Sequence, residues 1–158
     1  MQASKFISST LLTGKPRRIA WLMDLYERNY TLLMRLLPQL ALPFEHAVSK
    51  SATDLPLHLM AIERAPYTVE LRLTYEFRDE DGIRFSPDFW IKVYTDARVA
   101  EALHMSGRPP WLAQEGEIGQ AQAYLNDQWS RNVMLHKWLE YLLHHGHGFA
   151  HLARPMEA

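Results

Sequence analysis

The clearest pattern in the chain is a strict alternation of apolar and polar residues between positions 67 and 78. A two-residue period is that of a β-strand with one buried and one hydrated face, and such strands belong more often to antiparallel sheets. The segment is therefore predicted to be the central strand of an antiparallel sheet. Its apolar members are Tyr67, Val69, Leu71, Leu73, Tyr75 and Phe77, and the polar ones are Thr68, Glu70, Arg72, Thr74, Glu76 and Arg78.

Three further strands are expected around this one. Residues 79–82, Asp-Glu-Asp-Gly, have the composition of a tight turn, and the alternation resumes at 89–94. Because proline donates no ladder hydrogen bond, we expect Pro87 to lie outside any central strand. Residues 97–105 have a helix-like composition, but their place directly after a strand and turn favours the return arm of a hairpin. A weaker apolar run predicts a strand at 57–63.

Helical spacing marks both ends of the chain. Leucines and a tyrosine recur on one face of residues 17–37, a segment that is closed by Pro38. Asn29 interrupts this apolar stripe, so it is expected to bond to a neighbouring element. A second stripe runs through residues 127–145, and Gly146 is a natural end for that helix.

Together these elements predict an α+β fold with a long N-terminal helix, an antiparallel sheet of about four strands and a long C-terminal helix. Both helices are expected on one sheet face, because each has one apolar stripe to bury. Residues 16–147 are predicted to form a single domain. Residues 1–15 are expected to be a flexible tail and residues 148–158 a C-terminal tail.

Composition narrows the classes of function. The chain has 158 residues and no cysteine, so disulfides, thiolate nucleophiles and cysteine-ligated metals are excluded. The formal net charge of −1 gives no general attraction to nucleic acid, although a helix–sheet–helix order also occurs in double-stranded-RNA modules. No apolar stretch is long enough for a membrane span. The cytoplasm is the expected location.

Candidate chemistry is sparse. The chain contains no glycine-rich phosphate loop, dinucleotide fingerprint or nucleophile elbow, and no cofactor is predicted. Carboxylates that the sheet could bring together suggest one ligand pocket between sheet and helices, which would be an acid–base site only if burial shifted their pKa values. Its candidate residues are Glu63, Tyr94, Asp96 and Glu101.

Surplus aromatic residues point instead to a binding surface. Five tryptophans are many for one core, and exposed aromatic rings mark contact surfaces more often than catalytic sites. Trp90 falls on the polar side of its strand, and Trp111 lies in a loop rich in proline and glycine. These two residues, with Arg72 on the hydrated sheet face, are the predicted partner-binding residues.

Histidines gather around the end of the last helix, at His144, His145, His147 and His151. Imidazole is a common metal ligand, but histidines at a helix C-terminus are also favoured by the helix dipole. Gly146 should end the helix between His144 and His147. No metal site is predicted, and whether this cluster binds metal is left open by the sequence.

Several motifs resemble the YqiB-like family of small proteobacterial proteins of unknown function. The most specific are residues 93–101, VYTDARVAE, and residues 138–146, WLEYLLHHG. Residues 29–38, NYTLLMRLLP, resemble the first helix of the family, and residues 62–68 resemble its first hairpin. The resemblance spans roughly residues 16–147 and implies a bacterial cytoplasmic origin. It implies no reaction.

The sequence by itself does not identify the activity. The leading hypothesis is a non-enzymatic protein-binding or regulatory module of the bacterial cytoplasm, whose partner is another protein. The alternative is a small-ligand-binding domain or an enzyme built around the carboxylate and tyrosine pocket. A homodimer through a sheet edge or the long helices is compatible with either hypothesis.

Overall fold

The computed structural model describes residues 19–38, 40, 44–107 and 128–150. The part of the chain that it describes has five strands rather than about four. The additional strand, β1, lies within residues 39–56, where the sequence favours a connector with room for a short strand near residues 45–48. The elements in order are α2 (Ile19–Leu36), β1 (His46–Ser51), β2 (Asp54–Arg64), β3 (Thr68–Asp79), β4 (Gly82–Tyr94), β5 (Val99–Ser106) and α4 (Gln128–His144).

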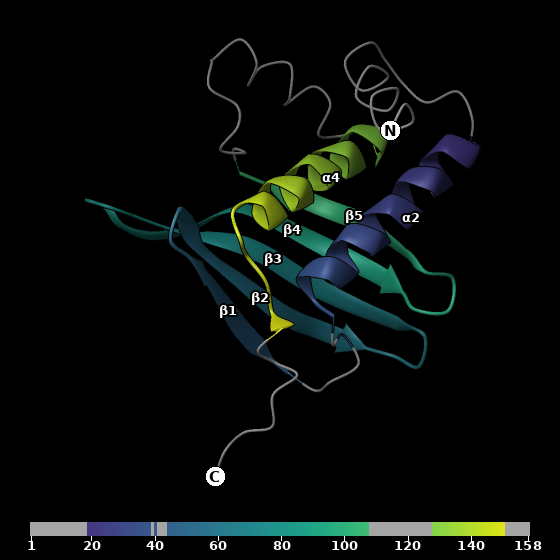
Figure 1. Cartoon of the computed structure of the whole chain (residues 1–158), viewed down its shortest axis with the longest axis horizontal. Coiled ribbons are helices and arrows are strands. Elements are labelled where there is room, and N and C mark those ends of the chain that lie inside the picture. The colour runs from purple at the N-terminus through teal and green to yellow at the C-terminus, as the bar shows by residue number, and fades with distance from the viewer. Residues whose placement is uncertain (1–18, 39, 41–43, 108–127, 151–158) are drawn as a thin grey trace.

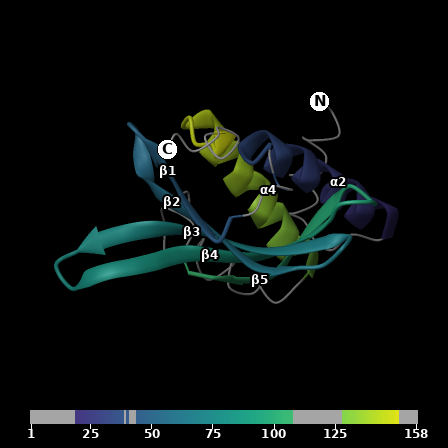
Figure 2. The same ribbon diagram turned by 90° about the horizontal axis from the view of Figure 1, so that it is seen from below.

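The strands form one antiparallel meander in the order β1-β2-β3-β4-β5. Both described helices pack on the same face of this sheet, and the ambiguous segment after the 95–98 turn is strand β5 (Figure 1). The α+β class is therefore confirmed. Neither described helix combines the length and apolar character that a membrane crossing requires. We call the face without a described helix the open face; Figure 2 views the sheet close to edge-on, with both helices on the opposite side.

The predicted alternation in β3 holds in its middle and fails at its ends. Leu71, Leu73 and Tyr75 are fully buried against the helices. Tyr67 and Phe77, which were expected on the same buried face, are 66% and 39% exposed. Tyr67 precedes the strand, and Phe77 lies past the last residue of β3 that β2 pairs with, so no core remains for either ring to enter.

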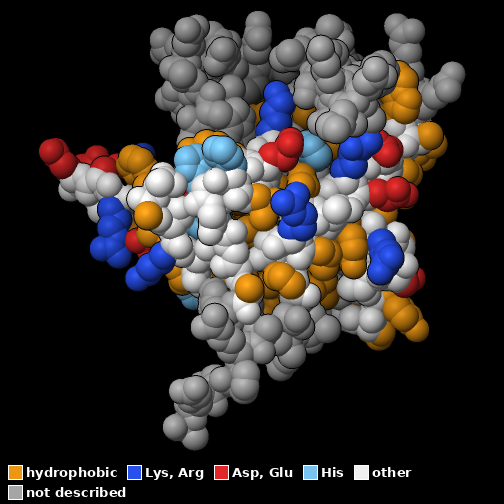
Figure 3. All heavy atoms as spheres, in the orientation of Figure 1, with side chains coloured by type: hydrophobic (Ala, Val, Ile, Leu, Met, Phe, Trp, Pro, Cys, Tyr) orange, Lys and Arg blue, Asp and Glu red, His pale blue; other side chains and the backbone are white. Residues whose placement is uncertain are grey.

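Residues 76–85 form a two-stranded arm that extends from the sheet. Pairing with β2 ends at Tyr75, and pairing with β5 ends at Asp88, so β3 and β4 pair only with each other in this segment. Figure 2 shows the arm extending sideways from the layered part of the molecule. Acidic and basic side chains crowd the arm at the left of the space-filling view (Figure 3). The turn at its tip is the predicted one, with Gly82 at a positive φ of 119°.

The expectation for Pro87 is wrong, because β4 runs through this residue and is paired on both sides. The strand accommodates the proline with a β-bulge. Thr74 lies opposite Asp88 while Glu76 lies opposite Phe85, so β4 holds one more residue than β3 across this interval. A bulge tolerates proline because its extra residue leaves the regular ladder.

The helix pair contains a polar contact that the sequence anticipated. The fully buried Asn29 of α2 donates its side-chain N–H to the carbonyl of Asn132 in α4, at 3.1 Å. Its other side-chain atom, Oδ1, lies 3.2 Å from His136 Nδ1. The partner expected for Asn29 is therefore confirmed, and the interruption of the apolar stripe fixes the register between the helices.

Helix α4 also protects the outer edge of β5. The side chain of Asn132 accepts the backbone N–H of Ala102 at 2.7 Å, and Arg131 Nε donates to the carbonyl of the same residue at 3.0 Å. An edge strand with unpaired backbone groups invites pairing with other chains. These two side chains satisfy the outward backbone groups at one position of β5 and lower that risk there.

The chain that follows α4 returns to the body of the protein. Gly146 ends the helix as predicted, with a φ of 80°, and the amides of Gly146 and His147 bond back to the last turn in a Schellman arrangement. Phe149 is fully buried, and its amide donates to the carbonyl of Leu36 at the end of α2. The described core thus extends to Phe149, and the predicted domain bounds stay a prediction.

Candidate functional site

The open face is ordered by the strand register into rows of side chains. One row runs across five strands as His46, Met60, Arg72, Trp90 and His104. In the next row, Glu70 lies opposite Lys92. Residues that share a row on one sheet face lie close enough for their side chains to interact. The open face is therefore a patterned surface of rings and charges.

A chain of hydrogen bonds crosses one end of this face. His46 Nε2 lies 2.7 Å from His58 Nδ1, and His58 Nε2 lies 3.0 Å from Glu76 Oε1. The second oxygen of Glu76 accepts a hydrogen bond of 2.8 Å from Arg78 Nε. We call these four residues the histidine–carboxylate chain. It joins β1, β2 and β3 at the base of the arm.

The carboxylate of Glu76 determines which atom donates in each hydrogen bond of the histidine–carboxylate chain. An ionised Glu76 only accepts, so His58 Nε2 must carry the proton between them. In neutral His58 the Nδ1 atom then accepts, and His46 Nε2 is its donor. The other ring nitrogen of His46, Nδ1, is then left as an acceptor. Hydrogen bonds from Arg78 and then His58 lower the pKa of Glu76, so the carboxylate is the stable form.

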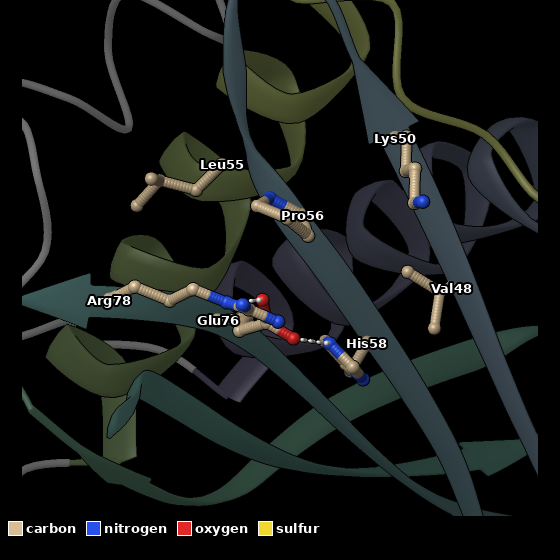
Figure 4. A pocket seen from close by; sticks show the side chains of 7 residues that line it. All are labelled: Val48, Lys50, Leu55, Pro56, His58, Glu76 and Arg78. Carbon is tan, nitrogen blue, oxygen red and sulfur yellow. Dashed lines mark hydrogen bonds and ion pairs between the residues drawn. The ribbon is translucent and has the colours of Figure 1, made fainter. Parts of the chain in front are cut away.

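A pocket with a volume of about 730 Å³ lies beside this chain. Its walls come from β1, β2 and β3. Figure 4 shows Glu76 of β3 between Arg78 and His58, with Val48 and Lys50 on β1, on the far side of β2. The size is within the range of ligand pockets. The lining combines three apolar residues with four that carry or can carry charge: Val48, Leu55, Pro56, Lys50, His58, Glu76 and Arg78.

The predicted ligand residues are brought together only in part. Tyr94 donates its hydroxyl to Glu101 Oε1 at 2.7 Å, and burial followed by this bond raises the pKa of Tyr94 to about 12. Glu63 is exposed on the same face, opposite Glu70. Asp96 is exposed in the 95–98 turn, where its carboxylate accepts the amide of Ala97 at 2.9 Å.

Glu101 also links the sheet edge to both helices. Gln128 of α4 approaches its Oε2 atom at 3.5 Å, and the same amide donates to the Tyr26 hydroxyl of α2 at 2.6 Å. Burial and the charge of Glu101 raise the pKa of Tyr26. These contacts give Glu101 a role in holding α2, α4 and β5 together, and the assignment of Glu63, Tyr94, Asp96 and Glu101 as a ligand site stays a prediction.

The predicted partner-binding residues are held by neighbours on the open face. Arg72 donates from Nε to both carboxylate oxygens of Asp88, at 3.1 and 3.0 Å. Trp90, partly exposed, donates its indole N–H to Glu70 at 3.2 Å. Trp111 lies outside the described residues. Arg72 and Trp90 therefore form a fixed surface, and its role in binding stays a prediction.

The described histidines near the C-terminus lie in different surroundings. His144 is exposed at the end of α4, His147 is buried, and His151 lies outside the described residues. His145 Nδ1 lies 2.9 Å from Thr53 Oγ1. Histidines gather over the end of α4 in Figure 3. Among the residues with described positions, no group of three or more histidine and carboxylate side chains is arranged to hold a metal ion.

A second hydrogen-bonded set has the composition of a catalytic triad but not its exposure. His147 Nδ1 lies 2.9 Å from Ser49 Oγ, and His147 Nε2 lies 3.0 Å from Asp54 Oδ2. Ser49 and His147 are 3% and 4% exposed, and Tyr75 donates to the same Asp54 oxygen at 2.6 Å. A nucleophile must be reached by its substrate. This set instead ties the chain after α4 to the β1–β2 hairpin.

Sequence reasoning missed both sets, for the same reason. Glu76 occupies an outward position of an alternating strand, which is a usable signal of its place on the open face. His58 lies in a stretch of β2 that is buried on both faces, so it gives no such signal. Their contact, however, depends on which residue of β2 lies opposite which residue of β3. His147 follows a helix end, and its buried partners lie more than ninety positions earlier in the chain.

Comparison with known proteins places the chain in a family. Neither the curated proteins nor the solved structures contain a match to it. The model of the family described as "Protein of unknown function (DUF1249)" matches residues 32–148. The match runs from the second half of α2 through the whole sheet and α4 to the segment that carries His147. Because the match covers most of its length, the chain belongs to the DUF1249 family of proteins of unknown function.

Proposed function

We propose that this protein is a binding module that holds another protein on its open sheet face. The observation that carries the proposal is the layering: both described helices cover one face, and the opposite face keeps a partly exposed row of rings and charges. Arg72 and Trp90 in this row are held by Asp88 and Glu70. Preorganised aromatic and arginine side chains are the usual energetic centres of protein interfaces.

The charge pattern of the face suits recognition more than catalysis. Charged side chains on this face pair with each other, as Arg72 does with Asp88. Such paired side chains are neutralised and held in place before a partner binds. Such preorganisation lowers the entropic cost of association. The YqiB-like resemblance and the bacterial cytoplasm as location stay predictions from the sequence and are compatible with this proposal.

A photo-crosslinking amino acid tests which face is used. Placed at Met60, in the middle row of the open face, it should capture one defined partner in cells. Placed at Glu27, an exposed position of α2, it should not. With the crosslinker at Met60, Trp90→Ala should reduce capture about tenfold or more, the usual effect of removing a central tryptophan. Equal capture from the two positions, or no capture from Met60, would refute the proposal.

The alternative, a small-ligand-binding domain or an enzyme, has one observation in its favour. Tyr94 and Glu101 are in direct contact, and Tyr26 and Gln128 converge on the same carboxylate. Calorimetry with a panel of small metabolites, repeated on Tyr94→Phe, would test this reading. A ligand that binds the native chain and loses affinity in the variant would favour the alternative.

A further inference from the structure

We propose that the pocket beside the histidine–carboxylate chain is the anchor point of the open face, and that it takes a carboxylate next to an apolar side chain on the partner polypeptide. This inference rests on the proposed binding function and specifies its chemistry. The pocket is lined by Lys50, His58, Glu76, Arg78 and three apolar residues.

Two cations of the pocket retain donors for a ligand. Arg78 is bonded to Glu76 through Nε, and its two terminal nitrogens donate to none of the residues that the structure describes. Lys50 is exposed and forms no ion pair within the described ranges. A guanidinium fork presents its terminal N–H groups in the geometry that a carboxylate accepts.

Both oxygens of Glu76 are occupied by hydrogen bonds that hold His58 and Arg78 in place. One of its oxygens is engaged by His58 at 3.0 Å and the other by Arg78 at 2.8 Å. When His58 is neutral, the pocket lining carries two positive charges, on Lys50 and Arg78, and one negative charge, on Glu76. Its net charge is then +1. A carboxylate from a partner would neutralise this positive charge, so charge complementarity favours an acidic ligand.

The apolar part of the pocket continues onto the arm. Val48, Leu55 and Pro56 line the pocket, and the ring of Phe85 packs edge-on against His58 with a centroid separation of 5.3 Å. Phe85 is 48% exposed, and Ile83, which lies opposite Arg78 in the register, is 53% exposed.

These apolar side chains form a strip that leads out of the pocket, beside the cations. A strip of this kind suits a polypeptide segment, whose apolar side chain can lie on the arm while its acidic neighbour enters the pocket. A small free acid would leave the strip on the arm uncovered.

The test uses the full chain and two short peptides, acetyl-Leu-Glu-Leu-amide and the same peptide with glutamine at the centre. Amide chemical shifts of the isotope-labelled protein follow the titrations. The acidic peptide should shift residues of β1, β2 and the arm, and should bind about five- to tenfold more tightly than the glutamine peptide at low salt. Since the contact is electrostatic, about 0.5 M salt should remove most of this preference.

Variants locate the site. Arg78→Gln should abolish the preference for the acidic peptide. Lys50→Gln should do the same, and the Lys50 side chain forms no ion pair with a described residue that this change would break. Arg84→Gln is the matched control, because Arg84 lies on the same arm but faces the opposite side, paired with Asp79. It should leave the preference unchanged. Equal loss in the Arg84 variant, or equal binding of the two peptides, would overturn the proposal.

Two other occupants give distinct results. If 4-methylpentanoate binds as tightly as the acidic peptide, the ligand is a free acid and the polypeptide assignment is wrong. If the protein dimerises and the acidic peptide dissociates the dimer, the occupant is a second copy of the chain, and the assignment to a different partner is wrong. Capture at Met60 without any peptide preference would refute only the pocket. Absence of capture at Met60 would refute the binding function itself, whatever the peptides do.

Discussion

The buried His147 gives a prediction in which stability depends on pH with a known sign. Its ring bonds to Ser49 and Asp54 at 2.9 and 3.0 Å, and the residue is 4% exposed. Burial, more than the opposing effect of Asp54, lowers the pKa of His147 below its ordinary value. The substitution His147→Gln keeps a neutral polar side chain of similar reach and removes the titration.

The magnitude follows from the number of protons bound. An unfolded histidine has a pKa of about 6.5 and takes up its proton as the pH falls, whereas folded His147 resists protonation. The unfolded state therefore binds more protons below this value, and the free energy of unfolding falls with the pH. Between about pH 7.5 and pH 5.5, this single group removes at most about 1.4 kcal/mol.

Urea unfolding followed by tryptophan fluorescence measures the effect, because Trp129 and Trp138 are almost fully buried. His147→Gln should cost about 1–2 kcal/mol near pH 7.5, the cost of weakened buried hydrogen bonds. The penalty should shrink by up to about 1.4 kcal/mol near pH 5.5, since the variant has no histidine here to protonate. His104→Gln removes an exposed imidazole and is the control. A penalty that stays constant or grows on acidification would refute the reasoning.

Two further predictions concern contacts that hold the edges of the sheet. Asn132→Ala should lower the free energy of unfolding by about 2–3 kcal/mol in urea, because it strips a buried β5 amide of its 2.7 Å partner. Gly107→Ala should lower the melting temperature by several degrees, a cost of about 1–3 kcal/mol, because φ is +90° and the new Cβ would lie 3.0 Å from Pro87 Cα. A neutral result in either variant would contradict the contact on which it rests.

The elements whose side chains follow one period were predictable from the sequence. Leu71 and Leu73 face the helices because the strand alternates, and Leu33 and Leu36 face the sheet because the helix turns every 3.6 residues. Both rules are local, so they need no knowledge of the neighbours. The same rules could not set the limits of the core, and this is why Phe77 was misplaced.

Strand β1 shows where a local rule gives little signal. Its sequence, His-Ala-Val-Ser-Lys-Ser, buries a small apolar residue and a serine, so its inward face resembles a connector. Ser49 is nevertheless 3% exposed, because its hydroxyl bonds to His147 and accepts the amide of Gly148. The burial of a polar residue depends on a distant partner, and the sequence of the strand does not contain that information.

The apolar strip that leads out of the pocket depends on the bulge at Pro87. Counted back from the buried Phe89 with a two-residue period, Phe85 should face the helices and Arg84 the open face. The register shows the reverse, because β4 carries one extra residue between Thr74 and Glu76 of its neighbour. Phe85 is therefore brought to His58, and Arg84 is directed away from the pocket. Pro87, which was expected to lie outside any central strand, is thus the residue around which β4 changes face. The apolar strip beside Arg78 includes Phe85 because of this change.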